Sequence, residues 1–154
     1  MILLVHLLFG AAIGSVVKSI PIAILLAFLS HYLLDLFPHI EYPISNIEKK
    51  QWRKTIPDFS RVFLDFCLGF LLIAVFSNSS TSQEQLIIYI CAFFAILPDG
   101  FTLLSKVAPI KILKIHNKFH EKIHFLKYEK ISNFWRIFSQ IVIVIISIIL
   151  LTRQ

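Results

Sequence analysis

The sequence predicts an all-α integral membrane protein, a single bundle of about five transmembrane helices with an amphipathic helix at the membrane surface. Of the 154 residues, 57% are hydrophobic and only 16% are charged, whereas soluble domains carry roughly 45–50% apolar and about 25% charged residues. The mean hydropathy is +0.80. The apolar residues also gather in segments of about the length of a membrane span, and the chain is long enough for one such bundle.

The predicted spans follow one another along the chain, separated by polar connections. They cover about residues 1–17, 20–38, 61–77, 85–105 and 134–152. A spanning helix needs about 20 mostly apolar residues, with a lower limit near 17. The first span is short, so a re-entrant segment is the alternative there. Because no Lys or Arg precedes its apolar run, we do not expect a cleaved signal peptide.

The distribution of basic residues predicts the orientation of the bundle. The 39–60 connection carries four Lys or Arg residues and the 106–130 connection carries seven lysines, whereas the 78–84 connection carries none. By the positive-inside rule, the N-terminus and both basic connections are cytoplasmic and the C-terminus is outside. We explain the net charge of +6 by this orientation in the bilayer and by attraction of the basic residues to anionic lipid headgroups, the expected partners. No nucleic-acid partner is expected.

The segment from about 110 to 128 predicts the amphipathic helix. Wound at about 100° per residue, it forms one apolar stripe and two flanking stripes, one of lysines and one of histidines. The apolar stripe is Ile112, Ile115, Phe119, Ile123 and Leu126; the lysines are Lys111, Lys114, Lys118 and Lys122; the histidines are His116, His120 and His124. Such a helix lies in the membrane interface, with histidines facing the mouth of the bundle. A solvated basic linker is the alternative.

Ionisable side chains at membrane depth are costly and mark candidate functional sites. His31, Asp35 and His39 follow one another at intervals of four residues, so they share one face of the second span. The others are His6 in the first span, Asp65 in the third and Asp99 in the fourth. With the predicted orientation, all of them lie in the cytoplasmic half of the membrane, as do the histidines of the interfacial helix.

Histidine and aspartate together are typical ligands of Zn²⁺, with Mn²⁺ or Fe as alternatives. The predicted divalent-metal ligands are His6, His31, Asp35, His39, Asp65 and Asp99. A binuclear site of this kind activates water and holds the oxygens of a phosphoester. His116 and His120 are the predicted catalytic residues, completing the ligand set or donating a proton to the leaving group. Lys114 and Lys118 are predicted to hold the substrate phosphate.

Other interpretations of these residues stay open at this point. His6 shares a stripe with Gly10 and Gly14, a spacing of small residues that lets a neighbouring helix come close. Asp65 has Arg61 four residues earlier and could form an ion pair within the helix. Asp99, between a proline and a glycine, could satisfy backbone groups freed by a helix break. The whole cluster could also be an ion or proton pathway, and the lysine stripe could serve a lipid-binding protein without catalysis.

Several short motifs resemble those of a known family. The stretch Ser30-His31-Tyr-Leu-Leu-Asp35-Leu-Phe-Pro-His39 resembles the SHxxxDxxxH element of the membrane-bound metal-dependent hydrolases, a prokaryotic family similar in its motifs to zinc-dependent phospholipase C. His6, Leu97-Pro98-Asp99 and the pair His116 and His120 resemble its other elements, although Leu-Pro-Asp follows SHxxxD here, the reverse of the expected order. The resemblance implies a metal-dependent phosphoesterase in the cell (inner) membrane of a prokaryote.

His120-Glu121-Lys122-Ile123-His124 is also a formal HExxH motif. In zinc proteases its histidines bind the metal and its glutamate is the general base, and the site-2 proteases carry it within the membrane. We therefore predict a membrane-embedded divalent-metal-dependent hydrolase acting on an amphiphilic phosphoester at the cytoplasmic leaflet. The alternatives are a non-enzymatic metal-, ion- or lipid-binding membrane protein and an HExxH-type zinc protease.

Overall fold

The computed structural model confirms the all-α fold class. It describes residues 1–41, 45–48, 51–78, 80–108, 110–124 and 131–153, and these contain helices and no strand. The helices are α1 (Leu3–Val16), α2 (Ile20–Asp35), α3 (Ser45–Glu48), α4 (Ile56–Phe76), α5 (Ser82–Val107), α6 (Lys111–Ile123) and α7 (Asn133–Leu151), with a 3₁₀ turn at Trp52–Lys54. Residues 125–128 of the predicted interfacial helix lie outside the described part.

Each predicted span contains a helix, but not every helix is long enough to cross a membrane. Within the described residues, three are long and apolar enough: α4, α5 and α7. Helices α1 and α2 have 14 and 16 residues, or roughly 21 and 24 Å at 1.5 Å per residue, against a hydrocarbon core of about 30 Å. The prediction of five spans therefore exceeds the three that the described helices support.

Helix boundaries account for the other differences from the predicted ranges. Helix α4 begins at Ile56, before the predicted start at 61, because Pro57 suits the first turn of a helix and Asp58 adds a favourable negative charge there. Helix α5 begins after Thr81, which forms a capping box with Glu84: Thr81 N donates to Glu84 Oε2 at 2.8 Å, and Glu84 N donates to Thr81 Oγ1 at 3.4 Å.

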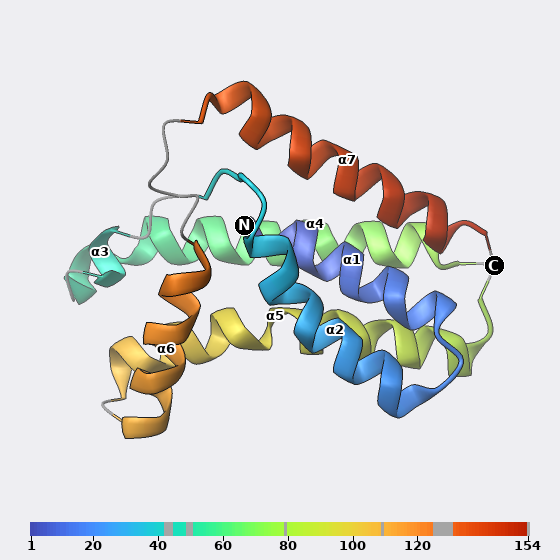
Figure 1. Cartoon of the computed structure of the whole chain (residues 1–154), viewed down its shortest axis with the longest axis horizontal. Helices are drawn as coiled ribbons and strands as arrows, with labels where there is room; N and C mark the ends of the chain where they lie inside the picture. Colours follow the sequence, from blue (N-terminus) through green and yellow to red (C-terminus); the bar gives the residue numbers. More distant parts are fainter. Residues whose placement is uncertain (42–44, 49–50, 79, 109, 125–130, 154) are drawn as a thin grey trace.

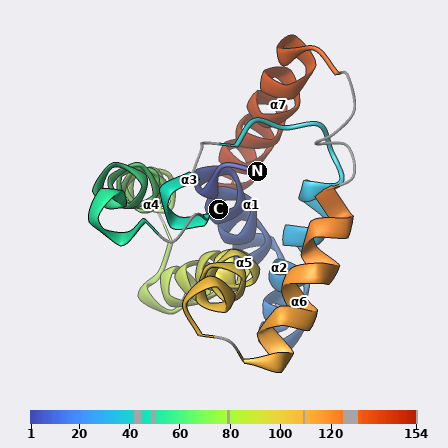
Figure 2. The same ribbon diagram turned by 90° about the vertical axis from the view of Figure 1, so that its left-hand side faces the viewer.

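Helix α1 is the central helix of the bundle, surrounded by α2, α4, α5 and α7 (Figure 2). Ten of its 14 residues are buried. The outer helices expose large apolar side chains, among them Phe63 and Leu64 of α4 and Ile141 and Ile145 of α7. The apolar character of α1 therefore fits a core position, whereas that of α4 and α7 fits contact with lipid.

The connections divide between the two ends of the bundle (Figure 1). Helix α3, the turn Trp52–Lys54 and α6 lie at one end, whereas the α1–α2 and α4–α5 connections and the C-terminus lie at the other. This arrangement separates the basic 39–60 connection and α6 from the 78–84 connection, which has no Lys or Arg. The N-terminus lies part-way along the bundle, beside the end of α2.

Gly10 and Gly14 let α1 and α5 approach closely, as the spacing of small residues predicted. A Cβ atom on Gly10 would lie 2.4 Å from Ala95 Cβ and 2.8 Å from Cys91 O, and one on Gly14 would lie 2.9 Å from Cys91 Cβ. The second of the two contacts at Gly10 is with a backbone atom, Cys91 O, which cannot move without its helix. Helices α1 and α5 would therefore have to separate to admit a side chain.

We expect Gly10→Ala to lower the free energy of unfolding by about 1–3 kcal/mol, the usual cost of overpacking. Gly100→Ala is the matched control, because a Cβ there meets no atom within 4 Å and alanine favours the helix. Unfolding both variants in mixed micelles with a chelator present measures the difference. Equal stability of the two variants would show that the α1–α5 contact is not tight.

Candidate metal centre

A buried cluster of histidines and aspartates forms where α1 begins and α2 ends. His6 lies in the second turn of α1, His31 and Asp35 lie in the last turns of α2, and α6 crosses beside them (Figure 2). His6 and His31 are completely buried and Asp35 is 1% exposed. Unpaired ionisable groups are strongly disfavoured in a protein interior, so the side chains of this cluster need charged partners or a bound metal ion.

The cluster contains three overlapping groups of potential metal ligands among the described residues. They are His6, His31 and Asp99; His31, Asp35 and His120; and Asp35, His39 and His124. In each group the ligand atoms all lie within 4.8 Å of one another. Since His31 and Asp35 each belong to two groups, the three form one continuous site.

Three imidazole nitrogens converge on one carboxylate oxygen in this site. Asp35 Oδ2 lies 3.2 Å from His31 Nε2, 3.1 Å from His120 Nε2 and 3.2 Å from His124 Nε2. The Nε2 atoms of His31 and His120 are 3.0 Å apart, and those of His120 and His124 are 3.3 Å apart. Ligands about 2.0–2.1 Å from a tetrahedral Zn²⁺ are about 3.3 Å from one another, so this spacing fits a metal ion.

The opposite ring nitrogens of these histidines contact oxygen atoms. His31 Nδ1 donates to Ala95 O at 2.8 Å and His39 Nδ1 donates to Phe37 O at 2.7 Å. His120 Nδ1 lies 3.1 Å from Thr102 Oγ1. A carbonyl can only accept, so the Nδ1 atoms of His31 and His39 carry a proton. The Nε2 lone pair of His31 is then directed into the cluster, whereas His39 Nε2 lies 3.0 Å from the Glu41 carboxylate. Metal-binding histidines are typically held in this way.

His6 provides the clearest test of whether the cluster fits a metal. Neither of its ring nitrogens has a hydrogen-bond partner, although Nε2 is 3.3 Å from Asp35 Oδ1, outside hydrogen-bond geometry. The ring stacks on His31 with centroids 4.0 Å apart. A fully buried imidazole without partners loses about 1–3 kcal/mol. Coordination together with His31 and Asp99 would give one of the two nitrogens a partner, so the residues fit a divalent metal.

Asp35 presents its two oxygens to different neighbours. Oδ2 faces the three converging Nε2 atoms, whereas Oδ1 lies 3.3 Å from His6 Nε2 and 3.9 Å from His39 Nε2. Oδ1 also accepts a hydrogen bond from the Met1 amino group at 2.8 Å. A carboxylate oriented like this can bind two metal ions at once, one through each oxygen.

Asp99 reaches the cluster from α5, which continues as a helix through Pro98. Its Oδ1 lies 3.6 Å from His31 Nε2 and 3.9 Å from His120 Nε2. The side chain is 34% exposed, which makes it the most accessible of the grouped ligands. The proline therefore does not end the helix, and the carboxylate faces the histidines.

Asp65 lies outside the three groups. Its Oδ2 accepts a hydrogen bond from Leu4 N at 3.0 Å, so it satisfies a backbone donor in the first turn of α1 that has no partner within that helix. For Arg61, considered above as an alternative partner of Asp65, the contact described is with Asp58: Arg61 Nη1 lies 3.5 Å from Asp58 Oδ1. The geometry gives Asp65 a structural role in positioning α1.

The sequence-based choice of ligands omitted His124, and it gave no role to Glu41, which lies beside the ligands but belongs to no ligand group. Glu41 Oε1 lies 3.0 Å from His39 Nε2 and 3.1 Å from His124 Nδ1. Burial by itself lowers the pKa of His124, but the neighbouring carboxylates of Asp35 and Glu41 outweigh it and raise that pKa to about 9. His124 is therefore protonated at neutral pH without a metal, and coordination would release its proton. The sequence signal for His124 as a ligand was its position four residues after His120, on the same face of the helix.

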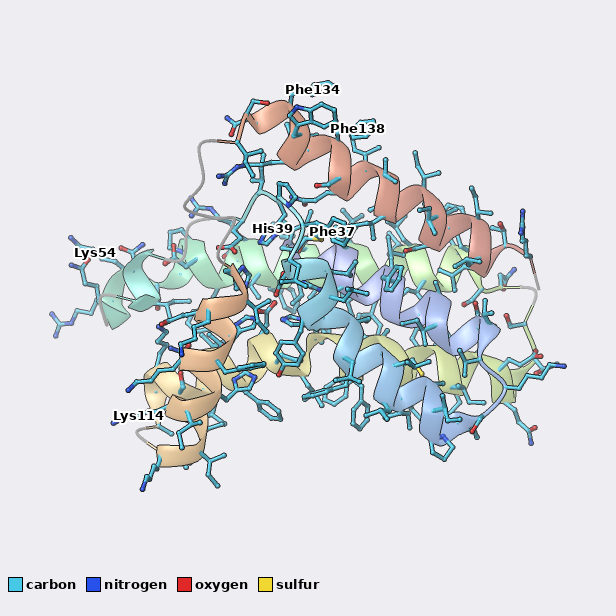
Figure 3. The ribbon with its side chains drawn as sticks, in the orientation of Figure 1. Phe37, His39, Lys54, Lys114, Phe134 and Phe138 are labelled. Carbon is cyan, nitrogen blue, oxygen red and sulfur yellow. The ribbon has the colours of Figure 1, made fainter. Side chains whose placement is uncertain are left out.

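The remaining predicted residues differ in their positions. His120 is a member of the second ligand group, but His116 is not in any group, and its Nε2 is 2.8 Å from the Tyr32 hydroxyl. Burial and the neighbouring His120 lower the pKa of His116. Lys114 and Lys118 are exposed on α6, and Lys114 lies at the end of that helix remote from His39 (Figure 3). The structure does not bring these lysines to the cluster.

Glu121, the general base expected for an HExxH protease, is directed away from the cluster. Its side chain is 58% exposed. Glu121 Oε1 accepts a hydrogen bond from Asn117 Nδ2 at 2.7 Å and lies 3.7 Å from Lys106 Nζ. The two histidines of the motif reach the candidate metal centre without the glutamate.

Two polar residues of α7 hold the segment that carries His39 and Glu41. The Ser139 hydroxyl donates to Pro38 O, and Gln140 Nε2 donates to Ile40 O at 3.1 Å. This segment follows α2 without helical structure, so its carbonyl groups need partners from elsewhere. Ser139 and Gln140, adjacent polar residues in an apolar span, were a signal in the sequence for this role.

Comparison of the chain with protein-family models, curated proteins and solved structures found no significant match.

Proposed function

We propose that the protein is a membrane-embedded hydrolase that uses divalent metal ions to cleave an amphiphilic phosphoester at the cytoplasmic leaflet. The observation that carries this proposal is that Asp35 belongs to two adjacent ligand groups and that its two oxygens face different histidines. A carboxylate shared in this way would hold two metal ions close together. Closely spaced metals are the arrangement that stabilises both the attacking and the leaving oxygen of a phosphoester.

The placement in the membrane is part of the proposal. Helices α4, α5 and α7 cross the bilayer, and α1 and α2 complete a five-helix bundle without reaching its full thickness. The N-terminus and the basic connections lie on the cytoplasmic side. The cluster is then embedded below the cytoplasmic surface, where a lipid-like substrate can reach it without leaving the membrane.

The residues of the chain have distinct roles in this proposal. His6, His31, Asp35, His39, Asp99, His120 and His124 hold the metal ions, Zn²⁺ first among the candidates because imidazole dominates the donor set. When bound, the metal supplies an activated water and a Lewis acid for the phosphoryl oxygen. His116, beside Tyr32 and outside the ligand groups, is the proton-transfer group in this proposal.

The alternatives are supported less well by the contacts. A protease would need Glu121 beside the metal, and this side chain is exposed and bound elsewhere. An ion pathway would need polar groups along the whole bundle, whereas the far half of α1 and the start of α2 are apolar. Metal binding without catalysis is the alternative that an activity assay separates from the proposal.

We expect Zn²⁺-loaded protein in nanodiscs to cleave phospholipid or a soluble aryl phosphodiester, and Asp35→Asn to reduce turnover at least about a hundredfold because the shared carboxylate is lost. Product release measured by mass spectrometry tests this. Asp65→Asn is the matched control, since it removes a partly buried carboxylate outside the ligand groups, and we expect it to retain turnover. Metal-loaded wild type without turnover on any phosphoester would leave only the binding alternative.

A further inference from the structure

Helix α6 has two chemically different faces. His120 and His124 face the candidate metal centre. Ile112, Ile115 and Phe119, at helical spacing on the other side, are 75%, 59% and 55% exposed. Beside them stand exposed lysines, Lys111, Lys114, Lys118 and Lys122. The helix therefore carries ligands on one face and an uncovered apolar and cationic surface on the other.

Few apolar contacts hold α6 against the bundle. Its only buried residue is His120, with His124 at its C-terminal end. The described hydrogen bonds from α6 to the rest of the protein are largely those of its histidines, to Tyr32, Thr102 and the cluster. Most helices in proteins are stabilised by burial of an apolar face. In α6 no apolar side chain is fully buried, although Phe119 contacts Tyr32 with ring centroids 5.7 Å apart. Much of its apolar surface is therefore left uncovered by the protein.

The exposed face of α6 matches the surface of an anionic bilayer. Its apolar residues suit the boundary between headgroups and acyl chains, and its lysines suit anionic phosphates. The bilayer is also within reach, because α6 lies in the chain between α5 and α7, both of which are long and apolar enough to span it. A soluble acidic partner would match the lysines but not the adjacent exposed isoleucines.

We propose that α6 docks on anionic lipid through this face and that docking is coupled to metal binding, because the same helix delivers His120 and His124 to the metal centre. This inference rests on the metal centre proposed above. A lipid surface that stabilises the docked position of α6 therefore also stabilises the arrangement in which His120 and His124 lie beside Asp35. By linkage, metal binding then strengthens lipid docking by the same factor.

Zn²⁺ affinity measured against a competing chelator in nanodiscs tests the coupling. We expect wild-type protein to bind Zn²⁺ about tenfold more tightly in nanodiscs with phosphatidylglycerol than in pure phosphatidylcholine, within the usual range of such coupling. Lys114→Gln combined with Lys118→Gln should remove most of this difference. High salt should also reduce it, since exposed charges are screened.

The double variant Arg53→Gln with Lys54→Gln is the matched control. It removes the same charge from exposed residues at the same end of the bundle, so it reports Zn²⁺ accumulation near the anionic surface that does not depend on α6. It should keep the tenfold difference. Equal Zn²⁺ affinity of wild type in both lipids, or equal loss in both double variants, would overturn the coupling and leave the metal centre intact.

Hydrogen exchange of the α6 amides separates failure of the inference from failure of the proposed function. We expect anionic lipid and Zn²⁺ each to slow exchange across Lys111–Ile123, and the two together to slow it most. Slower exchange with anionic lipid but no Zn²⁺ binding in either lipid would overturn the metal centre while supporting docking. Exchange that is insensitive to lipid would overturn docking, whatever Zn²⁺ does.

Discussion

Asp35→Asn is expected to lower the affinity for Zn²⁺ at least a hundredfold, on the order of 3 kcal/mol or more. The reason is that Asp35 belongs to two ligand groups and that its two oxygens face different histidines. An asparagine of the same size keeps the packing but offers only one oxygen and no charge. Competition with a calibrated chelator in detergent measures the affinity directly.

Asp65→Asn is the control for this substitution. It changes the same chemical group at a partly buried position, and that carboxylate accepts from Leu4 N and belongs to no ligand group. We expect Asp65→Asn to retain the affinity for Zn²⁺ within a few-fold. If both variants lost affinity equally, the effect would come from loosening of α1 and not from loss of a ligand.

The second large effect concerns stability. Bound metal would connect α1, α2, α5 and α6 through His6, Asp35, Asp99 and His120. A ligand that binds only the folded state stabilises it by about 4 kcal/mol when present at 1,000 times its Kd. We therefore expect saturating Zn²⁺ to raise the apparent unfolding temperature of wild-type protein in detergent by several degrees and a chelator to reverse the change.

His31→Ala serves as the comparison for the stability effect, because it removes a ligand that belongs to two groups. Zn²⁺ should not raise its unfolding temperature. An equal rise in His31→Ala and wild type would place the stabilising metal elsewhere on the protein.

The sequence was sufficient to locate the helices but not to say which of them cross the membrane. Helix α1 is as apolar as α7, yet α1 is surrounded by other helices and α7 faces outward. Hydropathy measures how poorly a segment dissolves in water, and it does not distinguish a protein environment from a lipid one. The length of α1 was the only signal, and it fell at the limit for a span.

The candidate ligands on one helix could be predicted, and those brought together by tertiary contacts could not. His31 and Asp35 share a face because the helical period fixes it. Asp65 and Asp99 look alike in the sequence, since both are isolated carboxylates in apolar helices. Only the packing decides that Asp65 meets the start of α1 and Asp99 meets the histidines. Glu41, in a segment without helical period, carried no signal at all.

Metal content measured by mass spectrometry tests the central claim most directly. Wild type, His31→Ala and His116→Ala would be purified without chelator, supplemented with Zn²⁺, Mn²⁺ or Fe²⁺, and freed of excess metal. His116 is the matched control because it is a histidine outside the ligand groups. We predict stoichiometric metal in wild type and His116→Ala and its loss in His31→Ala. No metal in wild type, or equal metal in all three proteins, would contradict the metal centre.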